Sequence, residues 1–136
     1  MELQTRKLNY DDYDNILTKW WSDWNWEAPS RDFLPENGEG GVIVFDGDEP
    51  ICAGFIYMTN SKVSWVDWIV SSKTYRKKPF RQQAINLLIE TLTNVCKNNG
   101  SKFSYALIKH KGLIGTYEKL GYTQADNYQT EVIKQL

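Results

Sequence analysis

Apolar residues along the chain fall into short runs separated by polar turns, and the period of each run predicts its secondary structure. Continuous or alternating apolar runs are typical of strands. We therefore expect strands over 3–8, 42–45, 51–59, 63–70 and 103–108, and a last short strand at Val132 and Ile133. Asp46-Gly47 between the second and third runs predicts a hairpin turn.

Helical period replaces strand period in the second half of the chain. From Ala84 to Cys96, apolar residues recur three and four positions apart, which places them on one buried helix face. This helix is expected to begin near Pro79 and to stop at Asn98-Asn99-Gly100. A second helix is expected from Lys111 to Leu120, and an earlier one from an N-cap at Asn9 to about Trp21.

The order of these elements predicts an α/β fold. Three consecutive strands followed by a strand-helix-strand crossover give a central mixed sheet, here of about six to seven strands, with helices on both faces. The stretch 22–35 has two prolines and no sustained period, which indicates a broken helix or a packed loop. No repeat or linker interrupts the chain, so we expect a single domain over 1–136.

Charge and composition narrow the classes of function. The chain has 136 residues with 16 Lys and Arg, 17 Asp and Glu and one His, a net charge of -1. This balance argues against a general nucleic-acid or membrane-surface binder. The longest apolar stretch, 51–58, is far shorter than the roughly 20 residues of a membrane span, and the N-terminus lacks a signal-peptide pattern. We expect a cytoplasmic protein with Cys52 and Cys96 reduced in its core.

Candidate chemistry lies where the strand ending at Val70 meets the helix beginning near Pro79. Ligands of open sheets collect beyond the carboxyl ends of strands, and a helix N-terminus attracts anions. Five cations surround this junction: Lys73, Arg76, Lys77, Lys78 and Arg81. They indicate either a site for a phosphate-bearing ligand or a solvated basic turn.

Two stretches resemble the GNAT superfamily of N-acetyltransferases. They are Tyr75-Arg76-Lys77-Lys78-Pro79-Phe80-Arg81 before the amphipathic helix, and Tyr117-Glu118-Lys119-Leu120-Gly121-Tyr122, which is close to the YEKLGF common in that family. The resemblance implies a GNAT-like fold. It also implies an acetyl-CoA co-substrate whose pyrophosphate is held by a loop of pattern Q/R-x-x-G-x-G/A.

In that loop Arg76 takes the Q/R position, whereas Pro79 and Arg81 replace the small residues. Proline removes one N–H donor, and arginine is bulky but offers a guanidinium to a phosphate. The residues that the resemblance assigns to the co-substrate are Trp68, Ile69, Val70, Arg76, Lys77, Lys78, Phe80, Arg81, Gln82 and His110.

The resemblance also implies catalytic residues for direct attack of an amine on a thioester in a ternary complex. Tyr117 matches the family's general acid; the alternative is a core aromatic packed against Leu113 and Leu120. Asp67 is the only carboxylate on the strand before the loop and is the candidate base. Simple alternation puts Asp67 on one face with Val63, Trp65 and Ile69, where an ion pair or a backbone hydrogen bond is the alternative role.

Four tryptophans between Trp20 and Trp26 occupy the segment that lines the acceptor pocket in GNAT relatives. They either hold an aliphatic amine or anchor a proline-broken segment to the core. The residues assigned to the acceptor are Trp20, Trp24, Trp26 and Glu27. We expect a small-molecule or protein amine as acceptor and no metal, because the single His has no companion ligands.

Three functions follow in order of support. The first is an acetyl-CoA-dependent N-acetyltransferase acting on a primary amine. The second is a catalytically inactive GNAT-fold protein whose Trp-rich surface binds a protein partner, an alternative favoured by the missing glycines. The third, a nucleic-acid binder, is limited by the neutral charge. A homodimer formed through the last strand is left open.

Overall fold

The centre of the protein is a five-stranded mixed sheet. The computed structural model describes residues 2–75 and 77–136, with the side chain of Lys78 also left out. The strands lie in chain order: β1 (Leu3–Lys7), β2 (Gly41–Asp46), β3 (Glu49–Met58), β4 (Val63–Ser71) and β5 (Phe103–Tyr105). The first four pair antiparallel, and β5 pairs parallel with β4.

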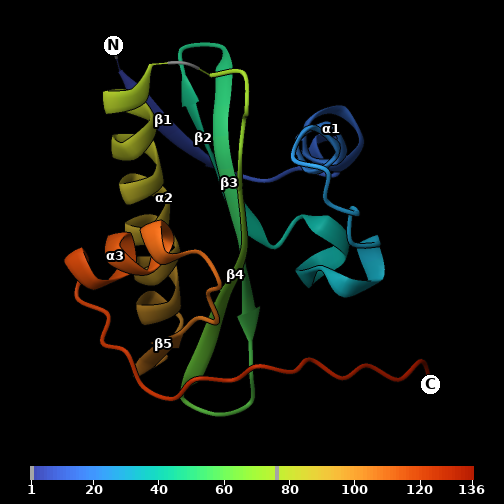
Figure 1. Cartoon of the computed structure of the whole chain (residues 1–136), viewed down its shortest axis with the longest axis vertical. Coiled ribbons are helices and arrows are strands. Elements are labelled where there is room, and N and C mark those ends of the chain that lie inside the picture. The colour runs from blue at the N-terminus through green and yellow to red at the C-terminus, as the bar shows by residue number, and fades with distance from the viewer. Residues whose placement is uncertain (1, 76) are drawn as a thin grey trace.

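Helices cover both faces of this sheet, as the sequence predicts (Figure 1). One face carries the π-helical turn η1 (Tyr13–Leu17), α1 (Thr18–Asp23) and two 3-10 turns, η2 (Arg31–Phe33) and η3 (Pro35–Gly38). The other face carries α2 (Lys78–Asn98) and α3 (Lys111–Lys119). The broken segment expected over 22–35 is therefore the end of α1 and the turns that follow it.

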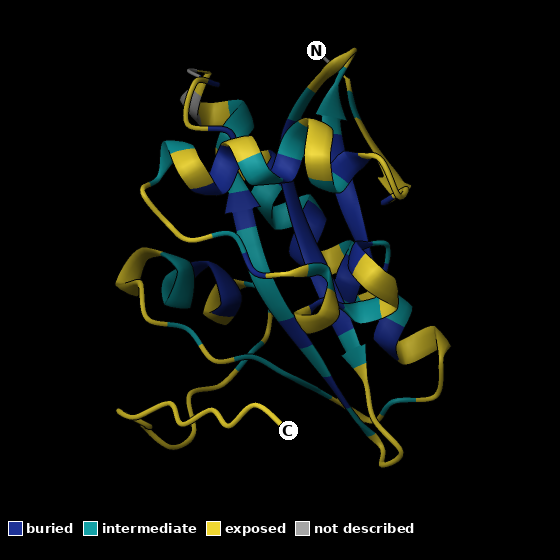
Figure 2. Ribbon diagram, turned by 90° about the vertical axis from the view of Figure 1, so that its right-hand side faces the viewer, coloured by how far each residue is buried: buried dark blue, intermediate teal, exposed yellow. Residues whose placement is uncertain are grey.

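Alternation along the central strands supplies two separate cores. On β2, Val42 and Val44 face α2, whereas Ile43 between them faces α1. The face of α2 predicted from its period packs into the first core: Ala84, Leu88, Leu92 and Cys96 are all buried there. Burial is concentrated in the middle strands and the inner faces of the helices (Figure 2). Cys52 and Cys96 are both buried and unbridged, as expected.

Gly54 on β3 allows α2 to approach the sheet closely. A Cβ atom at this position would lie 2.5 Å from Ile69 Cδ1 and 2.9 Å from Leu92 Cδ1. The neighbouring hairpin forms at Asp46-Gly47 as predicted, with Gly47 at φ 59°. Gly100, at φ 94°, follows the predicted end of α2.

The end of the chain departs from prediction. We expected six to seven strands with a last one at Val132 and Ile133, and the described residues form five. Val132 and Ile133 are 87% and 66% exposed and belong to no strand. Polar residues flank this pair on both sides, so strand pairing there would bury little apolar surface. The strand expected over 103–108 is also shorter, because it leaves β4 after Tyr105.

Candidate active site

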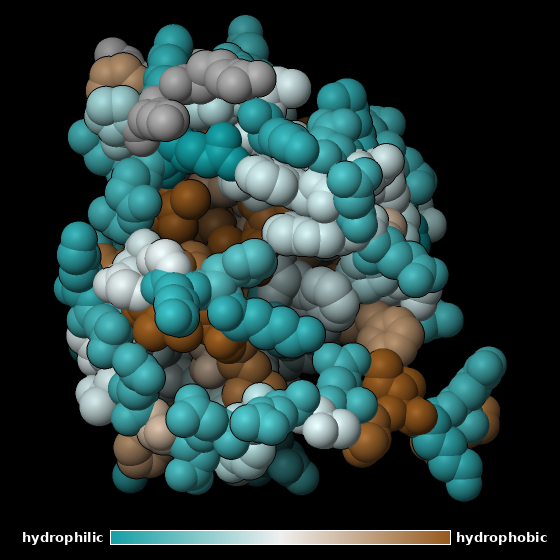
Figure 3. Space-filling model, viewed as in Figure 1, coloured by the Kyte–Doolittle hydropathy of each residue, from teal (hydrophilic) through white to brown (hydrophobic). Residues whose placement is uncertain are grey.

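The separation of β4 from β5 opens a cleft in the sheet. The two strands pair only over 63–65 and 103–105, after which β4 continues to Ser71 and the other chain segment turns toward α3. The cleft has a volume of about 750 Å³, and its walls come from β4, the segment 104–110, α3 and the segment 122–131. Hydrophobic residues near the centre of the face shown in Figure 3 are bordered by hydrophilic ones. Beyond Trp65, no described strand pairs with the edge of β4 that borders the cleft.

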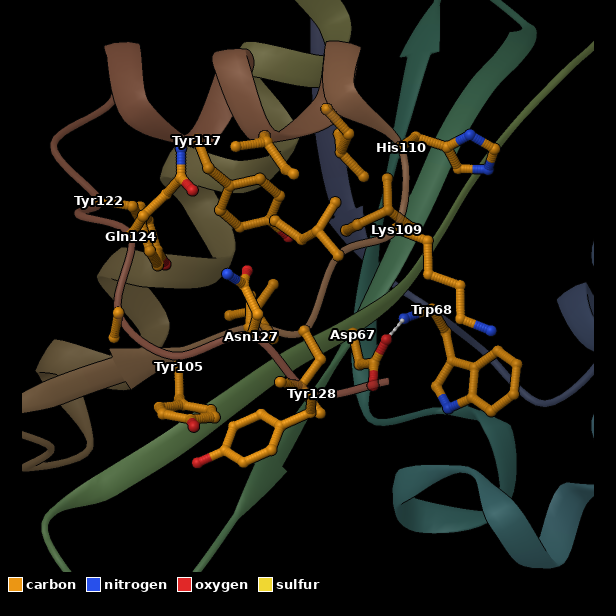
Figure 4. A pocket seen from close by; sticks show the side chains of 18 of the residues that line it. Asp67, Trp68, Tyr105, Lys109, His110, Tyr117, Tyr122, Gln124, Asn127 and Tyr128 are labelled. Atoms are coloured by element: carbon orange, nitrogen blue, oxygen red, sulfur yellow. Dashed lines mark hydrogen bonds between the residues drawn. The ribbon is translucent and has the colours of Figure 1, made fainter. Parts of the chain in front are cut away.

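A β-bulge in β4 sets the floor of the cleft. Phe55 of β3 lies opposite Asp67, and Ala53 lies opposite Val70, so β4 contains one residue more than β3 over this interval. Trp68 takes up the extra length at φ 58°, in a left-handed region that is unusual for a bulky residue. Its backbone N–H donates to Asp67 Oδ1 at 2.7 Å, which holds this conformation (Figure 4).

The bulge corrects the simple alternation expected for this strand. Asp67 and Trp68, although consecutive, both belong to the α1 face, since Asp67 lies opposite Phe55 and Trp68 packs in the same core as Phe55. Ile69 is turned to the α2 face and does not share a face with Asp67. The predicted backbone hydrogen bond is present, but it comes from Trp68, the residue expected to bind the co-substrate through its amide.

The Trp68 indole is fixed from two sides. Its Nε1 donates to the Tyr57 hydroxyl at 2.6 Å, and that hydroxyl donates to the Phe33 carbonyl at 2.6 Å. The Trp21 ring meets Trp68 edge to face with centroids 6.4 Å apart. Burial raises the pKa of Tyr57, so this phenol stays protonated near neutral pH and can keep donating to Phe33. The floor of the cleft is thus preorganised.

Asp67 is a half-buried carboxylate in this cleft. Burial raises its pKa, the Trp68 hydrogen bond opposes that shift, and the nearby charge of Glu131 adds to it. The net direction is upward from the usual value of 3.8. A carboxylate with a raised pKa in a cleft is better suited to accept a proton than a solvated one.

Tyr117 enters the same cleft from α3. It is 2% exposed and meets Tyr122 edge to face at 4.9 Å, while the Tyr122 hydroxyl lies 2.6 Å from both Thr93 Oγ1 and Ser104 Oγ. Burial first, then Tyr122 and Asp67, raises the pKa of Tyr117. Tyr117 also packs in the α2-side core, where Leu113 and Leu120 are partly buried neighbours. Its side chain therefore both lines the cleft and belongs to the core.

The loop between β4 and α2 is tied to the body of the protein. The Tyr75 hydroxyl donates to Asp46 Oδ2 at 2.9 Å, and Lys77 Nζ lies 3.6 Å from the same oxygen. The Arg81 guanidinium donates to the Tyr75 carbonyl at 3.0 Å and to Ser71 Oγ at 2.7 Å. The Arg81 guanidinium and the Lys77 ammonium, which we expected to bind phosphate, are therefore already engaged by groups of the protein itself. Arg76 and the Lys78 side chain were also assigned to the co-substrate and lie outside the described residues.

Only some of the other residues assigned to the co-substrate reach the cleft. Trp68, Ile69 and His110 line it. Val70 is buried in the α1-side core, and Phe80 packs against the α2-side core. Gln82 donates to Thr116 Oγ1 at 3.1 Å and joins α2 to α3.

The tryptophan segment divides between core and cleft. Trp20 is buried in the α1-side core, and Trp24 donates from Nε1 to the Ser71 carbonyl at 2.8 Å. Trp26 is 42% exposed and stacks on Trp24 with ring centroids 5.8 Å apart. Its ring also lies beside the His110 ring, with centroids 6.1 Å apart. Trp26 and Glu27 line the cleft. Trp20 and Trp24 therefore anchor the segment, whereas Trp26 is exposed in the cleft.

Sequence reasoning missed several residues of the cleft. Tyr105 and Lys109 lie where β5 separates from β4, and Tyr128 and Glu131 come from the segment before the last strand expected at Val132 and Ile133. For Tyr105 and Lys109, the only available signal in the sequence was their position at or beside the end of an expected strand. No feature of the sequence pointed to Tyr128 or Glu131. Among the described residues no group of three or more His, Cys, Asp and Glu is placed to hold a metal ion. No described helix has the length and apolar character of a membrane span.

No protein-family model and no curated protein sequence matches this chain. Several solved structures are similar to this chain over nearly its whole length. Glucosamine-6-phosphate N-acetyltransferase from Arabidopsis thaliana matches with a TM-score of 0.69, 14% identity, and coverage of 98% of this chain and 100% of its own. An aminoglycoside acetyltransferase from an uncultured soil metagenomic sample matches with a TM-score of 0.66, 14% identity, and coverage of 98% and 100%.

N-acetylglutamate synthase from Neisseria gonorrhoeae, solved with coenzyme A and N-acetyl-glutamate, gives a TM-score of 0.69 at 12% identity. The match covers 93% of this chain and 29% of that longer protein. At identities this low, the likeness concerns the fold.

Proposed function

Since this chain has the fold of the GNAT acetyltransferases, we propose that it is an N-acetyltransferase that moves an acetyl group from acetyl-CoA to an amine. The observation that carries the proposal is that Asp67 of β4 and Tyr117 of α3 line one cleft. A base for the amine and an acid for the leaving group are the two proton carriers that such a transfer needs.

The residues of the cleft fit the pantetheine arm of acetyl-CoA better than the residues at the α2 N-terminus fit its phosphates. The unpaired edge of β4 offers backbone N–H and C=O groups to the amides of a pantetheine arm. At the α2 N-terminus, Pro79 has no N–H, and Arg81 and Lys77 already have partners. Lys73, which lies over the Trp24 ring at 5.2 Å and donates to the Asp23 carbonyl, is an exposed cation of this loop. We expect acetyl-CoA to bind with a smaller phosphate contribution than a glycine-containing loop would give.

Acetyl-CoA supplies an acetyl group activated as a thioester. Asp67 accepts a proton from the acceptor ammonium, with Oδ1 held by the Trp68 N–H and the second oxygen left for the substrate. The amine nitrogen then forms a bond to the acetyl carbon as the carbon–sulfur bond breaks. Tyr117 gives its proton to the departing sulfur, and its raised pKa keeps it protonated until that step. The nitrogen bonded to the acetyl carbon then loses its extra proton to the Tyr117 phenolate, and Asp67 releases the first proton to solvent. The rigid Trp68 indole bounds the space in which the amine approaches.

Measuring acetyl transfer to a panel of primary amines, by thiol release and by mass spectrometry of the product, tests the proposal. Tyr117→Phe should lower kcat by about 100-fold and leave the dissociation constant of CoA nearly unchanged. Tyr13→Phe is the matched control, since the Tyr13 hydroxyl binds the Pro29 carbonyl outside the cleft. Equal kcat for Tyr117→Phe and the wild type would remove Tyr117 from the mechanism. Absence of any acetylated amine from a wild-type protein that binds CoA would refute the proposed activity.

A further inference from the structure

The ionisable groups of the cleft are strongly biased toward acids. Five described lining residues carry carboxylates: Glu27, Asp67, Glu118, Asp126 and Glu131. Lys109 is the one lysine among the described lining residues, which include no arginine, and His110 is the one histidine. The whole chain is nearly balanced, with 17 acids and 16 bases, so the cleft does not reflect the average composition.

Two of these carboxylates are close enough to repel one another. The charge of Glu131 is one of the causes that raise the pKa of Asp67, so both act on the same part of the cleft. Glu131 comes from the C-terminal segment and Asp67 from the bulge of β4, so two different parts of the chain contribute the pair to the cleft. A positive group between them would relieve this repulsion.

The aromatic residues beside these carboxylates are also suited to a cation. Trp26 is exposed next to Glu27 and stacks on Trp24. The Trp24 ring of this stack already has two positive groups near it, since Lys73 Nζ and Arg81 Cζ lie 5.2 and 5.7 Å from its centroid. An exposed indole beside a carboxylate binds an alkylammonium group through both its face and the negative charge.

We infer that the acceptor is an aliphatic amine with a second positive charge, such as a diamine or polyamine. The reacting amine faces Asp67, and the second ammonium is held by the carboxylates and indole of the cleft wall, Glu131, Glu27 and Trp26. An acceptor with a carboxylate or phosphate finds Lys109 as its one lysine or arginine partner among the described lining residues. This inference rests on the proposed acetyl transfer and adds the class of acceptor.

Three amines with the same four-carbon spacing test the inference, because they differ only at the far end: 1,4-diaminobutane, 1-aminobutane and 4-aminobutanoate. We expect kcat/KM to be about tenfold higher for the diamine than for the monoamine, and lowest for the amino acid. The difference should shrink as salt is raised from low to physiological strength, because the carboxylates are partly exposed.

Variants locate the second charge. Glu131→Gln and Trp26→Leu should each reduce the ratio of diamine to monoamine kcat/KM, whereas Lys109→Gln should raise it. Glu90→Gln, on the exposed side of α2, is the matched control for removing a negative charge outside the cleft.

Two outcomes separate this inference from the activity on which it rests. Equal kcat/KM for diamine and monoamine, or a preference for 4-aminobutanoate, overturns the inference and leaves the acetyltransferase intact. If none of the amines is acetylated, the proposed function fails, and calorimetric titration with the same three amines then decides the class of ligand. Tighter binding of the diamine supports a cation site, and equal or absent binding overturns it.

Discussion

Asp67 and Trp68 are neighbours in the sequence, and both belong to the same face of the sheet because the Trp68 N–H donates to Asp67 Oδ1 at 2.7 Å while Trp68 adopts φ 58°. One hydrogen bond thereby places a carboxylate and an indole side by side at the point where β4 and β5 separate. The cost of the left-handed conformation is offset locally, which is common at functional sites.

The Asp67→Asn substitution separates the proposed chemical role of this residue from its structural one. The side-chain carbonyl of the new amide still accepts the Trp68 N–H, so the bulge should persist, but the proton acceptor is lost. We expect kcat to fall by about 100-fold or more, measured with saturating acetyl-CoA and amine. Asp14→Asn, which changes an exposed carboxylate on η1, is the control. Retention of more than half of the wild-type kcat in Asp67→Asn would exclude Asp67 as the base.

Asp67→Asn should lower activity but should not lower stability, because folding raises the pKa of Asp67. A carboxyl whose pKa is raised by folding binds its proton more tightly in the folded state, so its ionisation destabilises the protein as pH rises through the folded pKa. Asp67→Asn should therefore be as stable as the wild type or more stable at pH 7, and this advantage should shrink as pH falls toward about 4. Thermal unfolding at several pH values measures it. An advantage that grew toward low pH would contradict the assigned direction.

The same shift predicts the pH dependence of catalysis. Activity should rise with pH through an apparent pKa above 3.8, as Asp67 becomes ionised, and this limb should disappear in Asp67→Asn. Tyr117 contributes no loss of activity near pH 10, because its pKa lies above the usual tyrosine value of 10. A profile of kcat/KM against pH, taken with an acceptor whose own pKa is known, checks both the rise due to Asp67 and the absence of a loss near pH 10.

Asp12 stabilises the turn before η1. It is buried, accepts two hydrogen bonds from Arg6 at 2.7 and 3.0 Å, and accepts one from the Asn9 N–H at 2.8 Å. Burial acts to raise the Asp12 pKa, but the Arg6 and Asn9 bonds outweigh it, so the net direction is down. Its stabilisation should be present above about pH 4 and decline as pH falls through the lowered pKa.

Asp12→Ala should lower the free energy of unfolding by about 2 kcal/mol at pH 7, because it leaves Arg6 and the Asn9 N–H without their partner. Asp14→Ala is the comparison, since its 72% exposed carboxylate makes one longer contact with Arg31 at 3.3 Å. Its loss should be below about 1 kcal/mol. Urea unfolding of both variants distinguishes them, and equal losses would contradict the structural role given to Asp12.

Much of the fold was predictable because local rules determine it. The Asp46-Gly47 hairpin needs a turn residue that tolerates positive φ, and the buried face of α2 follows from spacing alone. The tie between Gln82 and Thr116 has no such signal, because it depends on where α3 packs.

Some residues that line the cleft, such as Asp67 and Tyr117, were singled out from the sequence, but the geometry of the cleft was not predictable. Alternation failed at Ile69, because nothing in the sequence marks Trp68 as a residue with positive φ, a conformation more typical of glycine. The cleft itself depends on two strands separating after Trp65 and Tyr105, a property of sheet twist and loop packing rather than of any residue type. Val132 and Ile133 were assigned to a strand from their apolar character alone, and they have no strand partner.

The proposed activity is tested most directly by mass spectrometry of 1,4-diaminobutane incubated with acetyl-CoA and the purified protein. We expect monoacetylated diamine in an amount equal to the free CoA released, with about 100-fold slower formation by Tyr117→Phe and an unchanged rate for Tyr13→Phe. Release of CoA without acetylated amine, or no product from any amine tested, would contradict it.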